Sequence, residues 1–303
     1  MALGKGNDLI SVRDLEKKDI EAVFARARKF EAQAKAGKTR RTLEGRVVAS
    51  LFFEPSTRTR LSSESAAQRL GARVIGFSGT EGTSVQKGET LSDTIEMVDQ
   101  YADAIFMRHP LDGAARLAAQ IASHPVINCG DGANQHPTQT LLDLYTIQKE
   151  FGKIDGLEIA LVGDLKYGRT VHSLAMALNN YKVKLRFVSH ASLKMPDYVK
   201  KETENTFKET ETLDVGGCDV VYVTRIQKER FTDLMEYEKV KGTFKITPAA
   251  LGGAKKGMII MHPLPRVDEI SKEVDSTPHA RYFEQAGNGI FIRMAVLDAV
   301  ING

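Results

Sequence analysis

Residues 52–61 concentrate phosphate-binding chemistry in the run Phe-Phe-Glu-Pro-Ser-Thr-Arg-Thr-Arg-Leu. An apolar segment at 46–53 precedes it, and an amphipathic segment follows it. A helix that begins there presents free backbone N–H groups and the positive end of its dipole to an anion. Arg58 adds a planar, permanently charged guanidinium that matches phosphate oxygens. A capped helix with solvated arginines is the alternative, but the density of donors favours an oxyanion site. Its predicted members are Ser56, Thr57, Arg58 and Thr59.

Polar and mostly cationic residues also follow other predicted strands. Ligands of open parallel sheets bind beyond the carboxyl ends of the strands, so these loops are the candidate binding surface. Cationic groups without a metal-ligand cluster or a nucleophile suit substrates that carry several negative charges. The loop residues are Arg108, His136, Gln139, Arg169, Arg225, Gln227 and the run 263–266.

Each of these residues has a structural alternative. Arg108 could be a salt-bridged rim residue, and His136 could be only a cap before Pro137, which suits a first helical turn. The loop 163–168 could bind a dinucleotide, but it lacks the Gly-x-Gly-x-x-Gly spacing. The run 263–265 could be a rigid turn. Taken singly, Lys87, Arg169 and Arg225 could be surface charges.

Strand-like and helical segments alternate along the chain, which predicts an α/β fold with two doubly wound domains. Each domain is expected to be a parallel sheet flanked by helices. Strands are expected at 46–53, 72–77, 104–109, 126–130, 157–162, 183–188, 219–224 and 258–262. Helices are expected near 19–35, 58–70, 89–101, 112–122, 137–151, 168–180, 196–208, 247–255, 278–286 and 288–302. The predicted domains are 1–136 with 288–303, and 151–287, joined by an interdomain helix at 137–150.

Composition narrows the function classes. The 303 residues carry a net charge of +3 without a basic block, which argues against nucleic acid as a partner. We expect a cytoplasmic protein, because neither a signal peptide nor an apolar run long enough for a bilayer is visible. Cys129 and Cys218 read as reduced, packed thiols, and the histidines show no metal-ligand spacing, so no metal is expected.

Seven runs in order resemble the aspartate carbamoyltransferases of the transcarbamoylase family, over essentially the whole chain. The Ser-Thr-Arg-Thr-Arg run marks the wider family, whereas ornithine-type relatives usually carry cysteine where Pro263 stands. The runs are Phe53-Glu54-x-Ser56-Thr57-Arg58-Thr59-Arg60, Lys87-Gly88-Glu89-Thr90, Met107-Arg108-His109-Pro110, Asn134-Gln135-His136-Pro137-Thr138-Gln139, Gly163-Asp164-Leu165-Lys166-Tyr167-Gly168-Arg169-Thr170, Arg225-Ile226-Gln227-Lys228-Glu229-Arg230 and His262-Pro263-Leu264-Pro265-Arg266-Val267-Asp268-Glu269.

The resemblance implies transfer of a carbamoyl group from carbamoyl phosphate to L-aspartate, in pyrimidine (UMP) biosynthesis, without a cofactor. An ornithine-type carbamoyltransferase is the alternative. The implied carbamoyl phosphate ligands are Ser56, Thr57, Arg58, Thr59, Arg108, His136, Gln139 and the main-chain carbonyls of Pro263 and Leu264. Arg58, Thr59, Arg108 and His136 are the implied catalytic residues. Lys87, Arg169, Arg225 and Gln227 are the implied aspartate ligands.

The resemblance also implies that each active site is shared between subunits. Ser84 and Lys87 would enter from a neighbouring chain in a homotrimer. Two trimers could further associate with regulatory chains. The loop before Lys87 is one residue shorter than in the best-known relatives, so Lys87 is matched through Lys-Gly-Glu-Thr and Ser84 by its place in the loop.

Overall fold

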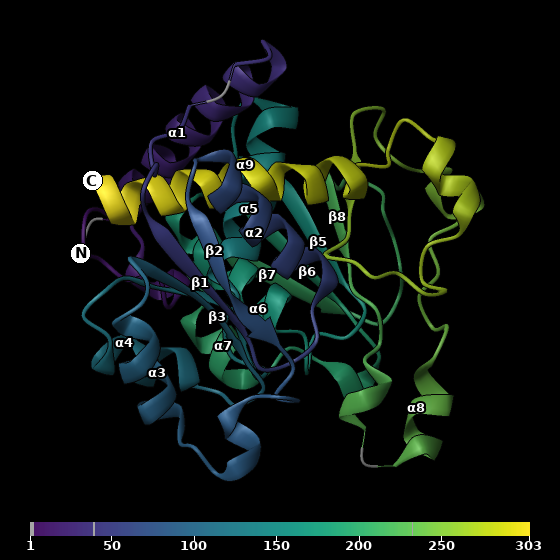
Figure 1. The fold of residues 1–303 in the computed structure, drawn as a ribbon. Coiled ribbons are helices and arrows are strands. Elements are labelled where there is room, and N and C mark those ends of the chain that lie inside the picture. Colours follow the sequence, from purple (N-terminus) through teal and green to yellow (C-terminus); the bar gives the residue numbers. More distant parts are fainter. Residues whose placement is uncertain (1–2, 39, 232) are drawn as a thin grey trace. The chain divides into compact units, whose positions relative to one another are not determined.

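A computed structural model describes residues 3–38, 40–231 and 233–303 (Figure 1). The chain divides into two compact units: unit 1 is Met1–Tyr145 with Gly287–Gly303, and unit 2 is Thr146–Ala286. Each unit contains a parallel sheet flanked by helices, so the predicted fold class is confirmed. The prediction that one domain binds carbamoyl phosphate and the other aspartate concerns ligands and stays a prediction.

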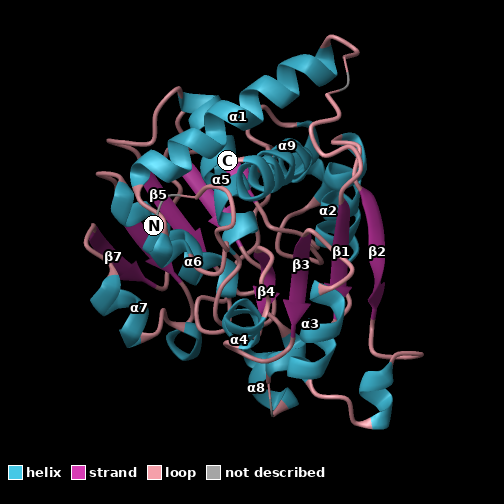
Figure 2. Ribbon diagram, turned by 60° about the vertical axis from the view of Figure 1, so that its left-hand side comes forward, coloured by secondary structure: helices cyan, strands magenta, loops and turns pink. Residues whose placement is uncertain are grey.

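The sheet of unit 1 places two strand ends at its centre. It consists of β1 (Val47–Phe52), β2 (Arg73–Ser78), β3 (Ala104–His109) and β4 (Val126–Asp131). All are parallel, in the order β2-β1-β3-β4, and Figure 2 shows them side by side. The chain moves outward from β1 to β2 and then returns to β3, so the order reverses between β1 and β3. Such a reversal is the usual ligand position in an open parallel sheet.

Helices cover both faces of this sheet because β1 is apolar on both faces. Ala49 and Leu51 belong to a buried cluster with Ile95 of α3 and Ala115 of α4. Ser50 points to the other face, where its hydroxyl donates to Glu64 of α2 at 3.0 Å. The helices lying wholly in unit 1 are α1 (Lys17–Lys35), α2 (Thr57–Arg69), α3 (Leu91–Asp99) and α4 (Ala114–Ile121). Parts of α5 (Pro137–Phe151) and α9 (Tyr282–Asn302) complete the unit.

Unit 2 repeats the doubly wound plan with one more strand. Its strands are β5 (Glu158–Val162), β6 (Lys184–Val188), β7 (Thr206–Thr210), β8 (Val220–Val223) and β9 (Ile259–Met261), all parallel, in the order β7-β6-β5-β8-β9. The order reverses between β5 and β8, so the loops after these two strands lie at the reversal. The helices that lie wholly in unit 2 are α6 (Arg169–Ala177), α7 (Asp197–Glu202) and α8 (Leu234–Val240).

The structure corrects three predicted helices. The helix expected at 196–208 ends at Glu202, and 206–210 form the edge strand β7, where Phe207 stacks on Phe187 of β6 with ring centroids 5.0 Å apart. The helix expected at 247–255 is only a 3-10 turn at Ala249–Leu251, in a segment bounded by proline and glycines.

The third correction concerns the C-terminal helix. The segments expected at 278–286 and 288–302 form a single helix, α9, which begins at Tyr282. Glycine is unfavourable inside helices, yet α9 continues through Gly287, where the break is predicted, and through Gly289. A Cβ atom at Gly289 would lie 2.4 Å from Nη1 of Arg293 and 3.1 Å from Leu142. The glycine is therefore explained by close packing of α5 and α9 inside unit 1.

Candidate functional site

The N-terminus of α2 directly follows β1 and carries the predicted oxyanion residues. Ser56 is the N-cap residue, but its side chain makes no capping hydrogen bond, so the first-turn N–H groups receive no side-chain acceptor from it. Thr57 and Arg58 are exposed, whereas Thr59 is only 7% exposed. This end of the helix therefore offers backbone N–H groups, hydroxyls and one guanidinium to an anion.

Arg60 belongs to the same run but has a different role. Its Nε donates to Oε1 of Glu64 at 2.7 Å, one helical turn further along α2. The same carboxylate oxygen accepts the Ser50 hydroxyl from β1. Glu64 therefore ties α2 to the sheet with Arg60 as its partner, and Arg58 is the arginine of this run that remains a candidate phosphate ligand.

Arg108 lies at the end of β3, next to the loop after β1. It pairs in register with Phe52, and its carbonyl accepts the N–H of Phe53 at 2.9 Å. Its Nε donates to Oε1 of Glu54 at 2.7 Å, and its side chain is 15% exposed. The rim salt bridge and the binding role, which the sequence left as alternatives, are thus compatible, because the ion pair ties the guanidinium to the loop that leads into α2.

His109, the next residue, has a structural role. Its Nδ1 accepts the backbone N–H of Leu111 at 3.1 Å, and its ring packs on Phe53 with centroids 4.8 Å apart. Burial lowers the pKa of His109, although the nearby carboxylates of Glu54 and Asp131 oppose the shift. A neutral ring that accepts a backbone hydrogen bond shapes the loop after β3.

Asp131 organises the loop that leads from β4 to His136. Its carboxylate is almost fully buried at 1% exposure. Both oxygens accept hydrogen bonds at 2.8 to 3.1 Å, which satisfies the charge and locks the loop. The donors are the side-chain amides of Asn128 and Asn134 and the backbone N–H groups of Gly113 and Gln135.

His136 and Gln139 lie at the start of α5. The carbonyl of His136 accepts the N–H groups of Gln139 and Thr140 at 3.0 and 3.1 Å, so this residue opens the helix. Its side chain is buried, with Nδ1 3.4 Å from the hydroxyl of Thr138. The amide of Gln139 donates to Oδ1 of Asp143 at 2.8 Å, which turns its carbonyl oxygen away from that carboxylate. Gln139 is therefore oriented as a hydrogen-bond acceptor.

The corresponding reversal in unit 2 is built around Asp164, which is fully buried. Its carboxylate accepts the N–H of Tyr167 at 2.9 Å and that of Gln227 at 3.3 Å, so it joins the loops after β5 and β8. Burial raises the pKa of Asp164, while these hydrogen bonds and the charge of Arg225 act in the opposite direction.

Arg225 lies beside a cavity in unit 2. The cavity has a volume of about 240 Å³. Lys228 and Lys241 also line it, together with Asp268 and Glu269. Arg169 is the first residue of α6, behind an N-cap glycine that supplies no side-chain cap. Three predicted residues, Arg169, Arg225 and Gln227, thus lie on the loops at one sheet reversal.

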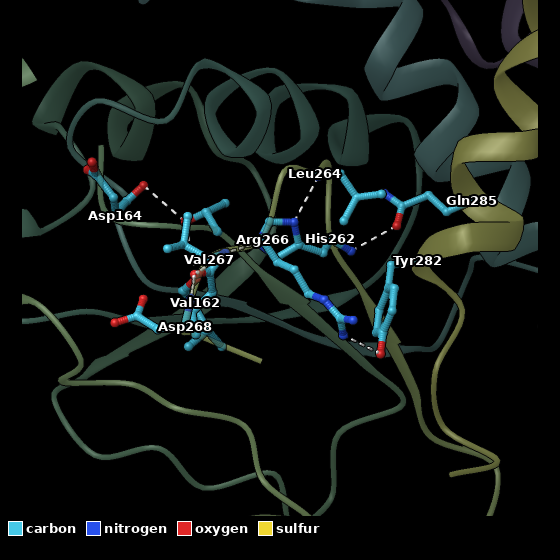
Figure 3. A network of polar contacts seen from close by, with 11 residues as sticks. Val162, Asp164, His262, Leu264, Arg266, Val267, Asp268, Tyr282 and Gln285 are labelled. Atoms are coloured by element: carbon cyan, nitrogen blue, oxygen red, sulfur yellow. Dashed lines mark hydrogen bonds and ion pairs between the residues drawn. The ribbon is translucent and has the colours of Figure 1, made fainter. Parts of the chain in front are cut away.

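Pro263 and Leu264 follow β9, and both are partly exposed. Leu264 has a φ of 56°, which is unusual for a residue other than glycine. Figure 3 shows this loop, with Leu264 and Gln285 hydrogen-bonded to His262. By contrast, Ser84 and Lys87 lie on an exposed 3-10 turn (Ser84–Lys87) between β2 and α3. Among the described residues, neither makes a side-chain hydrogen bond or ion pair with another predicted site residue.

Four acidic residues that position the site were not predicted as members of it. Their carboxylates hold Arg108, the 131–136 loop, Gln139 and the Gln227 loop. Three of the four follow directly on a predicted strand or on a glycine at a strand end, which is a usable signal, whereas the partner of each carboxylate cannot be read from the sequence. These residues are Glu54, Asp131, Asp143 and Asp164.

Two family models together match most of the chain. Residues 7–149 match the family model described as "Aspartate/ornithine carbamoyltransferase, carbamoyl-P binding domain". Residues 155–300 match the companion model, "Aspartate/ornithine carbamoyltransferase, Asp/Orn binding domain". The chain belongs to the aspartate/ornithine carbamoyltransferase family. The resemblance inferred from the seven sequence runs is thereby confirmed.

Curated members of the family resemble the chain along its length. The "Aspartate carbamoyltransferase catalytic subunit" of Thermococcus onnurineus is 58% identical over 298 residues, which cover 97% of this chain and 96% of the relative. The protein of the same name from Archaeoglobus fulgidus is 53% identical over 294 residues, covering 97% and 98%.

Solved structures of the family share the fold. The catalytic subunit of M. Jannaschii aspartate transcarbamoylase matches with a TM-score of 0.89 and 52% identity, covering 97% of each chain. The Trypanosoma cruzi aspartate transcarbamoylase in complex with carbamoyl phosphate and aspartate matches with a TM-score of 0.94 and 41% identity, covering 99% of this chain and 98% of that one.

The described residues also bear on membrane and metal sites. Within residues 3–38, 40–231 and 233–303, no helix combines the length and apolar character that crossing a bilayer requires. The same part of the chain contains no group of three histidine, cysteine or acidic side chains placed to hold a metal ion. Cys129 and Cys218 are both buried and unpaired, and burial raises the pKa of each thiol.

Proposed function

We propose that this chain is an aspartate carbamoyltransferase catalytic subunit. It transfers the carbamoyl group of carbamoyl phosphate to the amine of L-aspartate and releases N-carbamoyl-L-aspartate and phosphate. The observation that carries the proposal is the α2 N-terminus, which presents Arg58 and Thr59 and directly follows the loop whose Glu54 anchors Arg108. The names of relatives that match the whole chain support aspartate as acceptor and do not favour ornithine.

In unit 1 we assign the residues of the phosphate site. Backbone N–H groups and hydroxyls at Ser56, Thr57 and Thr59 hold the phosphate together with the guanidinium of Arg58. Arg108 lies one strand away and reaches both the phosphate and the carbonyl oxygen. His136 donates to that carbonyl oxygen, and Gln139 accepts from the carbamoyl amide, in line with the orientation that Asp143 imposes.

In unit 2 we assign the residues that recognise aspartate. Arg169, Arg225 and Gln227 bind its carboxylates, because a substrate with two negative charges requires cationic or donor groups. The main-chain carbonyls of Pro263 and Leu264 accept from the carbamoyl amide. Lys87, supplied with Ser84 by a neighbouring subunit, completes the aspartate site.

These roles are sufficient for the chemistry. The aspartate nitrogen attacks the carbonyl carbon of carbamoyl phosphate and forms the new C–N bond. Arg108, His136 and Thr59 stabilise the oxyanion of the tetrahedral intermediate. The bond from that carbon to the phosphate oxygen then breaks, and the departing phosphate accepts the proton of the amine. Rate enhancement comes mainly from positioning and electrostatic preorganisation.

We further propose that the protein acts in the cytoplasm as a homotrimer, in the step that commits carbamoyl phosphate to pyrimidine and UMP synthesis. Two trimers associating with regulatory chains would extend this assembly. Sharing of sites through Ser84 and Lys87 is supported by their exposure on a turn outside the core of their own subunit.

A side-by-side assay tests the proposed reaction. The purified chain is given carbamoyl phosphate with either L-aspartate or L-ornithine, and carbamoylated product and released phosphate are both measured. We expect stoichiometric N-carbamoyl-L-aspartate and phosphate from aspartate. Product from ornithine alone would overturn the aspartate assignment, and the absence of product from both would overturn the enzyme assignment.

A further inference from the structure

A buried histidine lies directly before the Pro-Leu-Pro loop of unit 2. His262 is 1% exposed and follows β9. Its Nε2 lies 2.6 Å from Oε1 of Glu269, and its Nδ1 lies 2.8 Å from the backbone nitrogen of Leu264. The backbone N–H of His262 donates to Oε1 of Gln285 at 2.8 Å (Figure 3). Both ring nitrogens of His262 and its backbone N–H therefore have hydrogen-bond partners.

The partners determine the proton on the ring. A backbone nitrogen can only donate, so Nδ1 of His262 accepts from Leu264 and Nε2 carries the proton donated to Glu269. The other oxygen of Glu269 accepts the N–H groups of Val267 and Asp268, each at 3.1 Å. Burial alone would raise the pKa of Glu269, but the hydrogen bonds from His262 and the backbone outweigh it and the pKa is lowered. A charged Glu269 therefore anchors one tautomer.

Leu264, which donates its N–H to His262, has an unfavourable backbone conformation. Leu264 has a φ of 56°, a left-handed conformation that is strained for a residue with a large side chain. Such a conformation persists only where the surroundings determine it. The hydrogen bond from the Leu264 N–H to Nδ1 of His262 spans Pro263 and holds the Pro263–Leu264 peptide, which contains the Pro263 carbonyl. It also restrains Leu264, which carries the second carbonyl.

We propose that His262 is a positioning residue for substrate recognition. As a neutral acceptor fixed by Glu269, it sets the direction of the Pro263 and Leu264 carbonyls and so the affinity for a carboxamide carried by a phosphate-like ligand. This inference rests on the proposed function, which assigns those carbonyls to the carbamoyl amide. It adds that the recognition depends on one ring nitrogen of a residue that does not contact the substrate.

Two variants separate the two ring nitrogens. In His262→Asn the side-chain oxygen can take the place of Nδ1 and accept from Leu264, whereas the donor to Glu269 is lost. In His262→Gln the side-chain amide can reach Glu269 in place of Nε2, whereas the acceptor for Leu264 is lost. Both variants remove the imidazole, so a general loss of packing affects them alike. The thermal unfolding midpoint of each purified variant measures that loss of packing.

The readout is the preference for a carboxamide. Phosphonoacetamide carries a phosphonate and a carboxamide, and methylphosphonate lacks the carboxamide. The ratio of their dissociation constants, measured by calorimetry on the intact protein, isolates the amide contact from the phosphate site. We expect His262→Asn to keep the wild-type ratio within about twofold and His262→Gln to lose about tenfold, as for one or two misdirected hydrogen bonds. Methylphosphonate affinity should not change in either variant.

The outcomes separate this inference from the proposed function. If His262→Gln keeps the wild-type ratio, or if a folded His262→Asn loses it, His262 does not position the carbonyls through Nδ1. The Asn variant alone decides the matter if the Gln variant does not fold. If the wild-type protein itself shows no preference for the carboxamide and does not carbamoylate aspartate, the proposed function fails and this inference fails with it.

Discussion

Arg108 and Glu54 form an ion pair across neighbouring segments of unit 1, with Nε of Arg108 2.7 Å from Oε1 of Glu54. Glu54 belongs to the loop after β1 and Arg108 to the end of β3, where the sheet order reverses. The two side chains are only 21% and 15% exposed, so the pair is partly shielded from water. The loop that leads to α2 is thus linked to the guanidinium of Arg108, and both α2 and Arg108 are proposed to contact carbamoyl phosphate.

Removal of Glu54 should therefore reduce catalysis through Arg108. We expect Glu54→Ala to lower kcat/KM for carbamoyl phosphate about 10- to 100-fold, because Arg108, a charge-stabilising donor, loses the ion pair that positions it. Steady-state kinetics measure this. Glu44→Ala is a matched control, since Glu44 pairs with Arg41 on the exposed surface of the same unit. Equal kinetics for the two variants would contradict a positioning role for Glu54.

Arg58 and Arg60 should differ sharply although they share a loop and a charge. We expect Arg58→Ala to reduce turnover about 100-fold or more, with little change in stability because Arg58 is exposed. Arg60→Ala should keep turnover within a few-fold, because Arg60 is committed to Glu64. Turnover of Arg58→Ala that stays near normal at saturating carbamoyl phosphate would remove Arg58 from the site.

Arg225 should govern the aspartate requirement. We expect Arg225→Ala to raise KM for aspartate about 10- to 100-fold, the cost of losing a charged hydrogen-bond partner of a carboxylate. Carbamoyl phosphate binding, measured separately by calorimetry, should change little. Lys241→Ala serves as the control, since Lys241 lines the same cavity but pairs with Glu238. A comparable rise in KM in both variants would indicate that the overall positive charge of the cavity, and not Arg225 itself, governs the aspartate requirement.

Gly163 should be required for the fold of the unit 2 loops. Its φ is 113°, and a Cβ atom would lie 2.3 Å from the carbonyl oxygen of Thr224. We expect Gly163→Ala to destabilise the protein by about 2 kcal/mol or more, because strain and a backbone clash act together. Gly253→Ala in the same unit meets no atom within 4 Å and should be nearly neutral. Equal thermal unfolding midpoints for both variants would contradict the clash.

Mixing of two inactive variants tests the shared site. We expect Lys87→Ala and His136→Ala to be nearly inactive alone, and mixed trimers formed by joint dissociation and reassembly to recover roughly a third of normal activity. A cyclic trimer with a directional exchange of loops contains one site with His136 from one chain and Lys87 from its neighbour. Native mass spectrometry confirms that mixed trimers formed. If they remain inactive, Lys87 serves its own subunit or none.

The strands and the loops that follow them were largely predictable from the sequence. Buried parallel strands are continuous apolar runs, and each predicted strand appears within one or two residues of its expected bounds. The edge strand β7 was missed because Thr206–Thr210 is polar on its exposed side and follows a true helical turn. Its pairing with β6 and the stacking of Phe207 on Phe187 decide its conformation, and these contacts are not local.

The sequence by itself determined which functional groups the chain carries at its strand ends. These are a donor-rich helix start at Ser56–Thr59 and cationic loops after strands, and both can be recognised from residue type and local order. Only the tertiary structure decided which loops meet, because strand order is set by packing of non-local segments and not by their spacing. It placed Arg108 beside Glu54 and committed Arg60 to Glu64, two arginines that composition cannot tell apart. It also placed Glu269 against His262, which fixes the acceptor nitrogen for Leu264. A side chain's partner depends on three-dimensional proximity, and residue type alone does not specify it.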